Sequence, residues 1–315
     1  MIRVSRPARG FRIVHGSSRA RGTGAHVVTI GNFDGVHVGH QALLSTARAR
    51  ADALGSVVAA LTFEPLPRDV MAPDHGVPRI QTRDDRVRWL SAHGADRVVL
   101  ERFSRVFAAR EASWFVEEVL LARLGAVAVV VGWDFRFGRG REGDAGLIAQ
   151  YVPVVDCVEP VIIAGGPASS TRVRRAVLEG DLDAATALLG RPHELAGPVV
   201  HGEARGRTIG FPTANVAVET ELMPPHGVYA VRAEVGGQWL PGVANLGTRP
   251  TVGAGRAPLE VHLFDGNWDL YDKPLRVALV ARLREERRFD SLAALSAQIA
   301  ADVVDARAVL AEGAG

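Results

Sequence analysis

Residues Thr29–His40 read TIGNFDGVHVGH, and this stretch decides which fold the first half of the chain can adopt. It joins an apolar run, predicted to be a buried strand over residues 27–32, to a glycine-containing turn. A helix predicted over residues 37–54 follows at once, with Gly55 as its stop. Such a helix points its free N–H groups at whatever occupies the turn, and its dipole favours an anion. The stretch therefore predicts an anion-binding site where a strand ends.

Strand and helix patterns keep alternating after this stretch, as far as about Gly190. Strands are predicted over residues 56–63, 97–100 and 126–132, and helices over residues 84–93 and 111–124. Strands separated by helices imply parallel βαβ units, in which ligands bind at the carboxyl ends of the strands. A Rossmann-like α/β domain with a parallel sheet is therefore predicted over residues 27–188, after a partly flexible leading arm over residues 1–26.

The pattern changes after the segment Leu189–Gly197, which reads LGRPHELAG. Short alternating runs are then separated by Gly and Pro, as is typical of an antiparallel sheet or small barrel. A long helix is predicted from Ser291 to about Leu310. Residues 189–315 are thus predicted to form a small antiparallel β-barrel with a terminal helix, and the fold class of the whole chain is α/β plus β-barrel.

The composition narrows the possible chemistry. The chain has 315 residues, of which 47% are hydrophobic and 23% charged, so two packed domains are expected. Lys273 is the only lysine, which excludes a GxxxxGK[ST] phosphate loop. Cys157 is the only cysteine, which excludes an internal disulfide. Any phosphate chemistry must therefore use backbone N–H groups, histidine, arginine, hydroxyls and a metal ion.

The sequence also favours one cellular compartment. No apolar run approaches the roughly 20 residues that a membrane-spanning helix needs. The Arg-rich start has no apolar segment of the kind found in secretory signals. We therefore expect a cytoplasmic protein with no membrane partner.

His37 and His40 are the first candidate site residues, because a spacing of three places them on one helical face. Gly31 and Gly35 allow a tight turn, and Gly39 is expected to keep that face open for a close approach. A histidine pair near a helix start is more often a cap or a surface feature, and a zinc site would need a third ligand nearby. The helix start and the glycines favour a phosphate.

A second segment, Ala168–Gly180, reads ASSTRVRRAVLEG and supports the same interpretation. It opens with hydroxyl residues of the type that cap helices, including Ser170 and Thr171. Arg174 follows one turn later, near enough to reach a phosphate held at the helix start. Many helices begin in this way, so the segment indicates a phosphate site only together with the His-x-Gly-His motif.

These two motifs, in this order, resemble the nucleotidyltransferase superfamily. The longer strings TIGNFDGVHVGHQ, TFEPLPRDV and VGWDFRFGRGREGD are similar to the FMN adenylyltransferase half of the bacterial bifunctional riboflavin kinase/FAD synthetases. The resemblance implies that the phosphate of FMN attacks the α-phosphate of ATP and that pyrophosphate leaves. Catalysis of this kind rests on positioning and charge stabilisation.

The resemblance also implies roles for individual residues. His37 and His40 would stabilise the triphosphate in the transition state. The expected ATP-binding residues of this domain are Gly31, Asn32, Phe33, Asp34, Gly39, Ser170, Thr171 and Arg174. The expected flavin-binding residues are Phe63, Arg68, Asp134, Phe135 and Arg136. Leu66 and Ala168 depart from the residues that relatives commonly carry.

The second half of the chain contains a candidate metal site in Gly202–Val216, which reads GEARGRTIGFPTANV. Thr213 and Asn215 lie two apart, so in extended backbone they point to the same side. A hydroxyl and an amide oxygen suit Mg²⁺, which prefers hard oxygen ligands and keeps waters and phosphates. An ordinary Asx or Ser/Thr turn is the alternative for so short a motif. The full string, however, resembles the riboflavin kinase signature.

Further motifs continue this second resemblance through PGVANLGTRPT, LEVHLFD and LREERRFDSL. It implies that Glu260 is the base that activates the riboflavin 5′-hydroxyl, since a kinase needs a base within reach of the attacking group. His262 should share the face of Glu260 and is expected to be a packed barrel residue. The resemblance further implies that Gly206, Gly210 and Thr213 bind ATP and that Arg284 and Phe289 lie near the flavin. Asp272 departs from the glycine usual in relatives.

The sequence is therefore interpreted as a bifunctional transferase with Mg²⁺ as cofactor, ATP as co-substrate and FMN and FAD as products. A riboflavin kinase with a degenerate adenylyltransferase domain is the alternative. A nucleic-acid-binding protein is a third possibility, but aromatic residues are only 6% and do not interleave with basic clusters. The expected partners are riboflavin, FMN and ATP, with no nucleic acid, and the expected state is a monomer or weak homo-oligomer.

Overall fold

A computed structural model describes residues 10–22, 24–201, 210–247, 259–266 and 268–312, and the chain divides into two compact units. The first, called the sheet unit, contains the described residues before Pro78 together with Arg83–Ser169. The second, called the barrel unit, contains Pro78–Thr82 and the chain from Ser170 onward.

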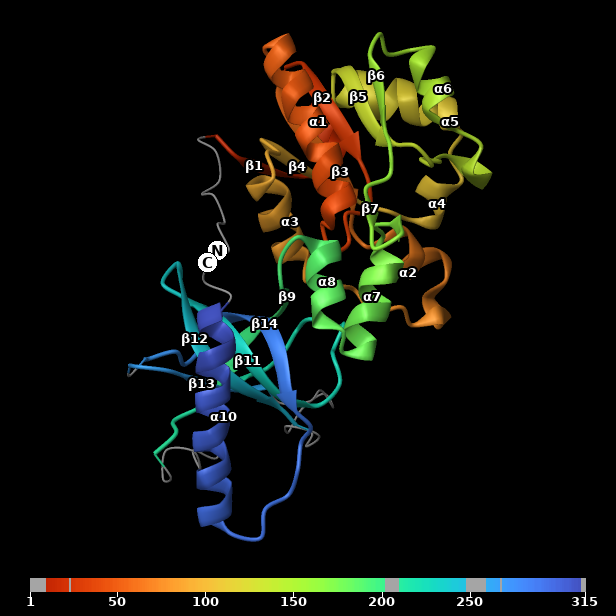
Figure 1. The fold of residues 1–315 in the computed structure, drawn as a ribbon. Coiled ribbons are helices and arrows are strands. Elements are labelled where there is room, and N and C mark those ends of the chain that lie inside the picture. Colours follow the sequence, from red (N-terminus) through yellow and green to blue (C-terminus); the bar gives the residue numbers. More distant parts are fainter. Residues whose placement is uncertain (1–9, 23, 202–209, 248–258, 267, 313–315) are drawn as a thin grey trace. The chain divides into compact units, whose positions relative to one another are not determined.

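The sheet unit is built on six parallel strands in the order β1-β4-β3-β2-β5-β6 (Figure 1). The strands are β1 (Arg12–His15), β2 (His26–Ile30), β3 (Val57–Phe63), β4 (Arg97–Glu101), β5 (Ala126–Gly132) and β6 (Val155–Val158). All five residues of β2 are buried, as expected for a strand covered on both faces of a parallel sheet. The predicted parallel α/β sheet is confirmed.

The strand β1 lies inside the stretch predicted to be a leading arm, and that expectation needs correction. β1 pairs in parallel with β4, with Arg12 opposite Arg97, and the short 3-10 helix η1 (Ser17–Ala20) follows it. Three of the four β1 residues are exposed. An exposed edge strand this short has no apolar alternation, so the sequence pattern did not reveal it.

Helices connect the strands of the sheet unit. They are α1 (Val38–Leu54), α2 (Pro67–Met71), η2 (Pro73–His75), α3 (Arg83–Ala92), α4 (Arg105–Ala108), α5 (Ala112–Trp114), η3 (Phe115–Arg123), η4 (Arg139–Arg141) and α6 (Ala145–Ala149). Gly55 ends α1 in a left-handed conformation, φ 60°, as predicted. The single helix predicted over residues 111–124 is instead α5 followed by η3, which has π-helical hydrogen bonding. A pair of short strands, β7 (Ile162–Ile163) and β8 (Gly166–Pro167), precedes the end of the unit.

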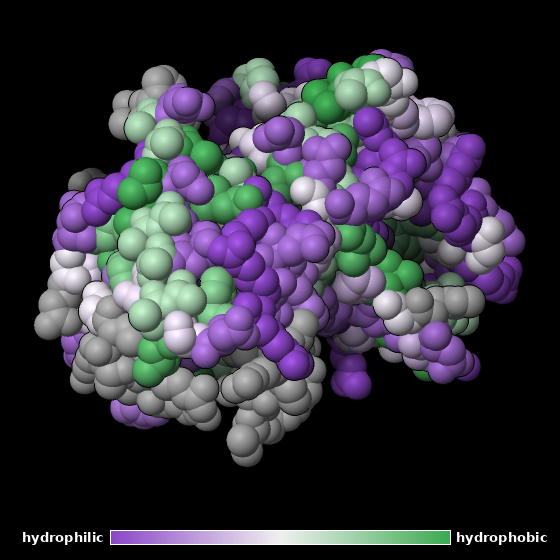
Figure 2. All heavy atoms as spheres, turned by 60° about the horizontal axis from the view of Figure 1, so that its bottom comes forward, coloured by the Kyte–Doolittle hydropathy of each residue, from purple (hydrophilic) through white to green (hydrophobic). Residues whose placement is uncertain are grey.

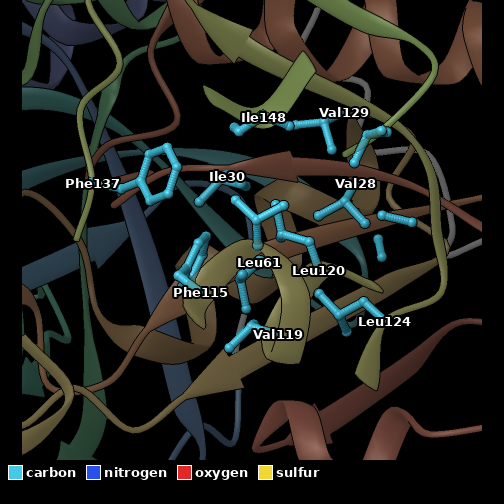
Figure 3. Close-up of a cluster of buried hydrophobic side chains, with 14 of the residues drawn as sticks. Val28, Ile30, Leu61, Phe115, Val119, Leu120, Leu124, Val129, Phe137 and Ile148 are labelled. Atoms are coloured by element: carbon cyan, nitrogen blue, oxygen red, sulfur yellow. The ribbon is translucent and has the colours of Figure 1, made fainter. Parts of the chain in front are cut away.

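The core of the sheet unit lies between the sheet and η3 (Figure 3). Val28, Leu61 and Val129 come from three neighbouring strands, and Phe115 and Leu120 come from η3. Each of these five side chains is at most 4% exposed. This packing anchors the strands whose carboxyl ends carry the candidate site.

The barrel unit is a closed antiparallel barrel in the order β10-β13-β12-β11-β14-β9, as predicted. Its strands are β9 (His193–Val200), β10 (Ala214–Val216), β11 (Gly227–Val235), β12 (Gln238–Leu246), β13 (Leu259–Leu263) and β14 (Pro274–Arg284). Its helices are α7 (Ser170–Glu179), α8 (Leu182–Leu189) and the terminal α10 (Leu292–Glu312).

Helix α10 lies along the outside of the barrel (Figure 1). Its Ala306 and Leu310 pack with Val228 and Val243 from the barrel strands. Opposite faces of the same strands fill the barrel interior, where Tyr229 and Ala244 are fully buried. A residue of β12 or β13 therefore points either into this interior or to the outer face.

No helix in the described part of the chain is long and apolar enough to cross a membrane. Hydrophilic residues cover much of the face drawn in Figure 2, with smaller hydrophobic areas between them.

Candidate functional site

The turn after β2 has an unusual backbone. Phe33 and Val36 adopt positive φ values of 50° and 40°, and Gly35 has a φ of 91°. A β-branched residue with positive φ is an outlier, and such strain is concentrated at functional sites. The turn is held from outside, because the Asn32 carbonyl accepts hydrogen bonds from the Thr62 hydroxyl at 3.1 Å and from Arg86 at 3.3 Å.

His37 and His40 lie together at the start of α1. Their rings stack with centroids 3.7 Å apart and an interplanar angle of 22°. The ring of Phe33, which is fully buried, packs edge-on against His40 at 5.2 Å. Burial, and secondarily the neighbouring His37, hold the pKa of His40 well below its usual value of 6.5. His40 is therefore a neutral imidazole at pH 7, with its Nδ1 buried and not hydrogen-bonded by any described residue.

Gly39 lies against the ring of His37. A Cβ at this position would stand 3.1 Å from the His37 ring and 3.5 Å from the Ala168 carbonyl. The absence of a side chain at this position thus makes room for the imidazole of His37.

Arg68, a predicted flavin-binding residue, forms an ion pair with Asp34, a predicted ATP-binding residue. The Arg68 guanidinium donates to the Asp34 carboxylate at 2.8 Å, and the Asp34 side chain is only 3% exposed. Arg86 holds the neighbouring strand end, because it donates to the Phe63 carbonyl at 3.2 Å and pairs with Glu64. The sequence pattern gave no sign of Arg86, since it lies in a charged helical run.

A chain of aromatic rings links Phe63 to Phe135, two of the predicted flavin residues. Phe63 contacts Phe103 at 5.5 Å and Phe107 at 6.0 Å. The chain continues through Phe115 and Phe137 to Phe135, which stacks on Phe137 at 5.5 Å. Phe103 and Phe107 were missed because two aromatic residues four apart suggest only a helix face.

Asp134 and Arg136 lie on the surface of the same loop. Arg136 pairs with the Asp144 carboxylate at 2.6 Å, and both side chains are about half exposed. Asp144 also caps α6 by accepting from the Leu147 N–H at 3.0 Å. That backbone hydrogen bond, followed by Arg136, lowers the pKa of Asp144.

Ser170 and Thr171 form the first two residues of α7, so the segment does open a helix as predicted. Arg174, one turn further along, is buried and donates from Nε to the Pro78 carbonyl at 2.8 Å. These three residues belong to the barrel unit rather than to the sheet unit that carries the histidines.

In the barrel, Glu260 of β13 lies directly opposite Asn215 of β10. Leu259 and Val261, on either side of Glu260, are buried in the barrel interior, so Glu260 points to the outer face. His262 shares that face, as predicted, and its Nδ1 lies 2.8 Å from the Pro212 carbonyl. This contact ties β13 to the residue that precedes Thr213. The described residues thus place Asn215 and Glu260 on adjacent strands, with Thr213 immediately before β10.

The other residues predicted for the kinase site are two glycines, Gly206 and Gly210, and the pair Arg284 and Phe289. Gly210 has a φ of 86°, and no described atom beyond its chain neighbours would lie within 4 Å of a Cβ there, whereas Gly206 lies outside the described residues. Arg284 makes a double hydrogen bond to Asp302 of α10 at 2.8 and 2.7 Å. Its guanidinium also lies 5.8 Å from the Phe289 ring.

Two departures from the family pattern have structural explanations. Leu66 is 1% exposed, so an apolar residue suits its buried position. Asp272 adopts a φ of 59°, the left-handed conformation that glycine reaches most easily. Its N–H still donates to the Val199 carbonyl at 3.0 Å.

The described residues contain no group of three or more His, Cys, Asp or Glu side chains that could hold a metal ion. Thr213 and Asn215 instead offer one hydroxyl and one amide oxygen. Mg²⁺ commonly takes one or two protein ligands and completes its shell with waters and substrate phosphates. The donor set at β10 therefore fits magnesium bound together with ATP.

The two units and their sites define a class of protein, a two-domain nucleotide-dependent transferase. The FAD synthetase family (FAD_syn) matches residues 20–172, and the riboflavin kinase family (Flavokinase) matches residues 189–310. The chain belongs to the family of bifunctional riboflavin kinase/FMN adenylyltransferases. Its C-terminal part is a riboflavin kinase and its N-terminal part an FMN adenylyltransferase. This supports the bifunctional interpretation over the single-activity alternative.

Relatives that carry the name of this family match nearly the whole chain. The bifunctional riboflavin kinase/FMN adenylyltransferase of Escherichia coli strain K12 is 44% identical over 302 residues, covering 94% of this chain and 96% of the relative. The Bacillus subtilis strain 168 enzyme is 35% identical over 288 residues, covering 89% and 91%. A Streptococcus pneumoniae structure titled as a macrolide-efflux protein is 34% identical, with a TM-score of 0.83, covering 92% of this chain and 97% of its own.

Proposed function

We propose that the turn after β2 and the start of α1 hold the ATP triphosphate during transfer of the adenylyl group to FMN. The stacked pair His37–His40 carries this proposal, because the pair stands at a helix start beside a strained turn. A triphosphate at this position would favour imidazolium, so ATP binding would be coupled to proton uptake by His40. The resemblance to the nucleotidyltransferases also implies phosphate contacts for Ser170, Thr171 and Arg174.

The proposed flavin side follows the aromatic chain. Phe63 and Phe135 offer ring faces or edges for the isoalloxazine, and Arg68, held by Asp34, offers a cation for the FMN phosphate. Asp134 and Arg136 would border the same ligand from the exposed loop after β5.

In the barrel unit, we propose that Glu260 accepts the proton of the riboflavin 5′-hydroxyl as that oxygen attacks the γ-phosphate of ATP. Thr213 and Asn215 would hold Mg²⁺, which supplies charge stabilisation for the transferred phosphoryl group when bound. The cross-strand pairing of Asn215 with Glu260 supports this division of roles, because a metal ligand at Asn215 and a base at Glu260 would then be neighbours. Gly206 and Gly210 would border the ATP phosphates, and Arg284 and Phe289 would lie near the flavin.

One experiment separates the two sites. His40→Ala and His37→Ala should lower FAD formation from FMN and ATP by at least about a hundredfold, because the transition-state charge loses its donors. FMN formation from riboflavin should stay within about twofold of the wild-type rate. Glu260→Gln and Asn215→Ala should show the opposite pattern, since only the kinase uses them.

Product analysis by chromatography with riboflavin, FMN and ATP in separate assays gives both rates. Equal damage to both reactions by each substitution would contradict the division into two sites. Omission of Mg²⁺ should abolish FMN formation, and a magnesium-independent kinase would contradict the metal assignment.

We also propose that the adenylyltransferase domain, which includes β1, extends to residue 188 and that the kinase domain extends over residues 189–315. We further propose that the protein acts in the cytoplasm, and that it is a monomer or weak homo-oligomer. Sedimentation analysis and cell fractionation would test the last two statements.

A further inference from the structure

Arg86 of α3 is a buried cation that has no role in the reactions described so far. Its side chain is only 3% exposed, although arginine is seldom fully buried unless it is paired. One terminal nitrogen of its guanidinium donates to the Asn32 carbonyl at 3.3 Å. The other donates to the Phe63 carbonyl at 3.2 Å and pairs with the Glu64 carboxylate. One side chain thus bridges two separate segments of backbone.

The two carbonyls stand at the carboxyl ends of neighbouring strands. β2 and β3 pair in parallel as far as Ile30 and Leu61. Asn32 lies past the end of β2, and Phe63 is the last residue of β3. Arg86 therefore continues the connection between the two chains beyond the point where the strand pairing stops.

The surroundings of the guanidinium are themselves held in place. Val87 and Leu90 of the same helix are buried, so the base of the Arg86 side chain is fixed by packing. The segment after β3 is also tied to the end of β4, because the Glu64 N–H donates to the Glu101 carbonyl at 2.9 Å. The bridge thus joins well-anchored elements on both sides.

The two bridged ends lead into the two sides of the proposed adenylyltransferase site. Asn32 belongs to the turn proposed to hold ATP, and Phe63 belongs to the proposed flavin side. The ion pair of Arg68 with Asp34 joins the same two sides through side chains, whereas Arg86 joins them through the backbone. Transfer between two bound substrates needs the reacting atoms about 3–3.5 Å apart, so the spacing of the two sides controls the rate.

We propose that Arg86 is a positioning residue for adenylyl transfer, which holds the ends of β2 and β3 at a fixed spacing so that the FMN phosphate meets the α-phosphate of ATP. This inference rests on the proposed placement of ATP beside β2 and of FMN beside β3. Arginine suits the task because its planar guanidinium presents several donors in a rigid fork. Lysine carries its donors on one nitrogen of a flexible stem, so it would keep the charge beside Glu64 and lose the fixed spacing.

The test is the steady-state rate of FAD formation from FMN and ATP in Arg86→Lys. We expect kcat to fall at least about tenfold, a part of the roughly 10²-fold that a misplacement of about 1 Å costs. The KM for FMN and for ATP should change less than about threefold, because each substrate keeps the contacts of its own strand end. The reverse reaction, from FAD and pyrophosphate to FMN and ATP, should slow by a similar factor, since both directions share one transition state.

Arg83 supplies the matched control, because it lies on the same helix with its side chain about half exposed and pairs with the adjacent Asp84. Arg83→Lys should leave the rates in both directions unchanged. Arg86→Met removes every donor and should lower kcat further than Arg86→Lys does. Thermal unfolding and FMN formation from riboflavin by each variant check that both units remain folded.

A kcat of Arg86→Lys within about twofold of the wild-type value would overturn the role of Arg86, even if KM rose. A loss of kcat that disappears in assays well below the unfolding transition would also overturn it, since that pattern indicates packing alone. Wild-type FAD formation by His40→Ala would instead overturn the proposed ATP site, and the inference with it.

Discussion

At the scale of single residues, burial decides the charge states of the histidines. His193 of β9 is fully enclosed, and its Nε2 lies 2.9 Å from the Leu222 carbonyl, which can only accept a hydrogen bond. Nε2 therefore carries the proton of a neutral ring. Burial lowers the pKa of His193 from 6.5 to about 4. The folded protein thus binds this proton less readily than the unfolded chain does.

Because the unfolded chain binds this proton more readily, acid favours unfolding. The free energy of unfolding should be highest above pH 6.5 and should fall as the pH drops toward about 4, by up to about 3 kcal/mol from this group. His193→Gln should flatten this part of the pH profile, as measured by urea unfolding at several pH values. His226→Gln, at an exposed position, is the control and should leave the slope unchanged. An unchanged slope in His193→Gln would contradict the assignment.

At the scale of elements, the position of the His37 ring at the start of α1 depends on Gly39, which has no side chain. Gly39→Ala should favour the helix by up to about 1 kcal/mol on propensity alone. The new methyl group would nevertheless stand 3.1 Å from the His37 ring and displace it. We expect FAD formation to fall at least about tenfold while FMN formation is retained. Steady-state assays of both reactions would show this, and Ser45→Ala, at an exposed position of the same helix, is the control.

Elements with strong periodicity were predictable, and weakly patterned ones were not. The buried strands β2, β3 and β5 and the helix α1 lie within two residues of their predicted bounds. The exposed edge strand β1 had no apolar pattern to reveal it. The π-helical hydrogen bonding of η3 was equally hidden, because an apolar periodicity predicts a helix without specifying its hydrogen-bond register.

At the scale of the whole molecule, two separate cores support two separate reactions. The sheet unit packs around η3, and the barrel unit packs around its own interior. Among the described residues, none belongs to both of these cores, so damage to one site should leave the other intact. FMN is the product of one reaction and the substrate of the other.

A mixture of two variants tests this independence. Neither His40→Ala nor Glu260→Gln alone should form FAD from riboflavin, whereas an equimolar mixture should do so after a lag in which FMN accumulates. Chromatographic time courses would follow both products. A mixture that forms FMN but no FAD would show that FMN does not pass between molecules and would contradict the prediction.

The sequence by itself determined the two-part fold and the family. Periodicity reports burial, and the motifs keep their chemistry within a few consecutive residues, so both can be read without a structure. Only the tertiary structure decided which distant residues meet, such as Arg68 with Asp34 and Asn215 with Glu260. Strand register and side-chain packing set these pairs, and neither leaves a local signal along the chain because each depends on segments that fold together from far apart.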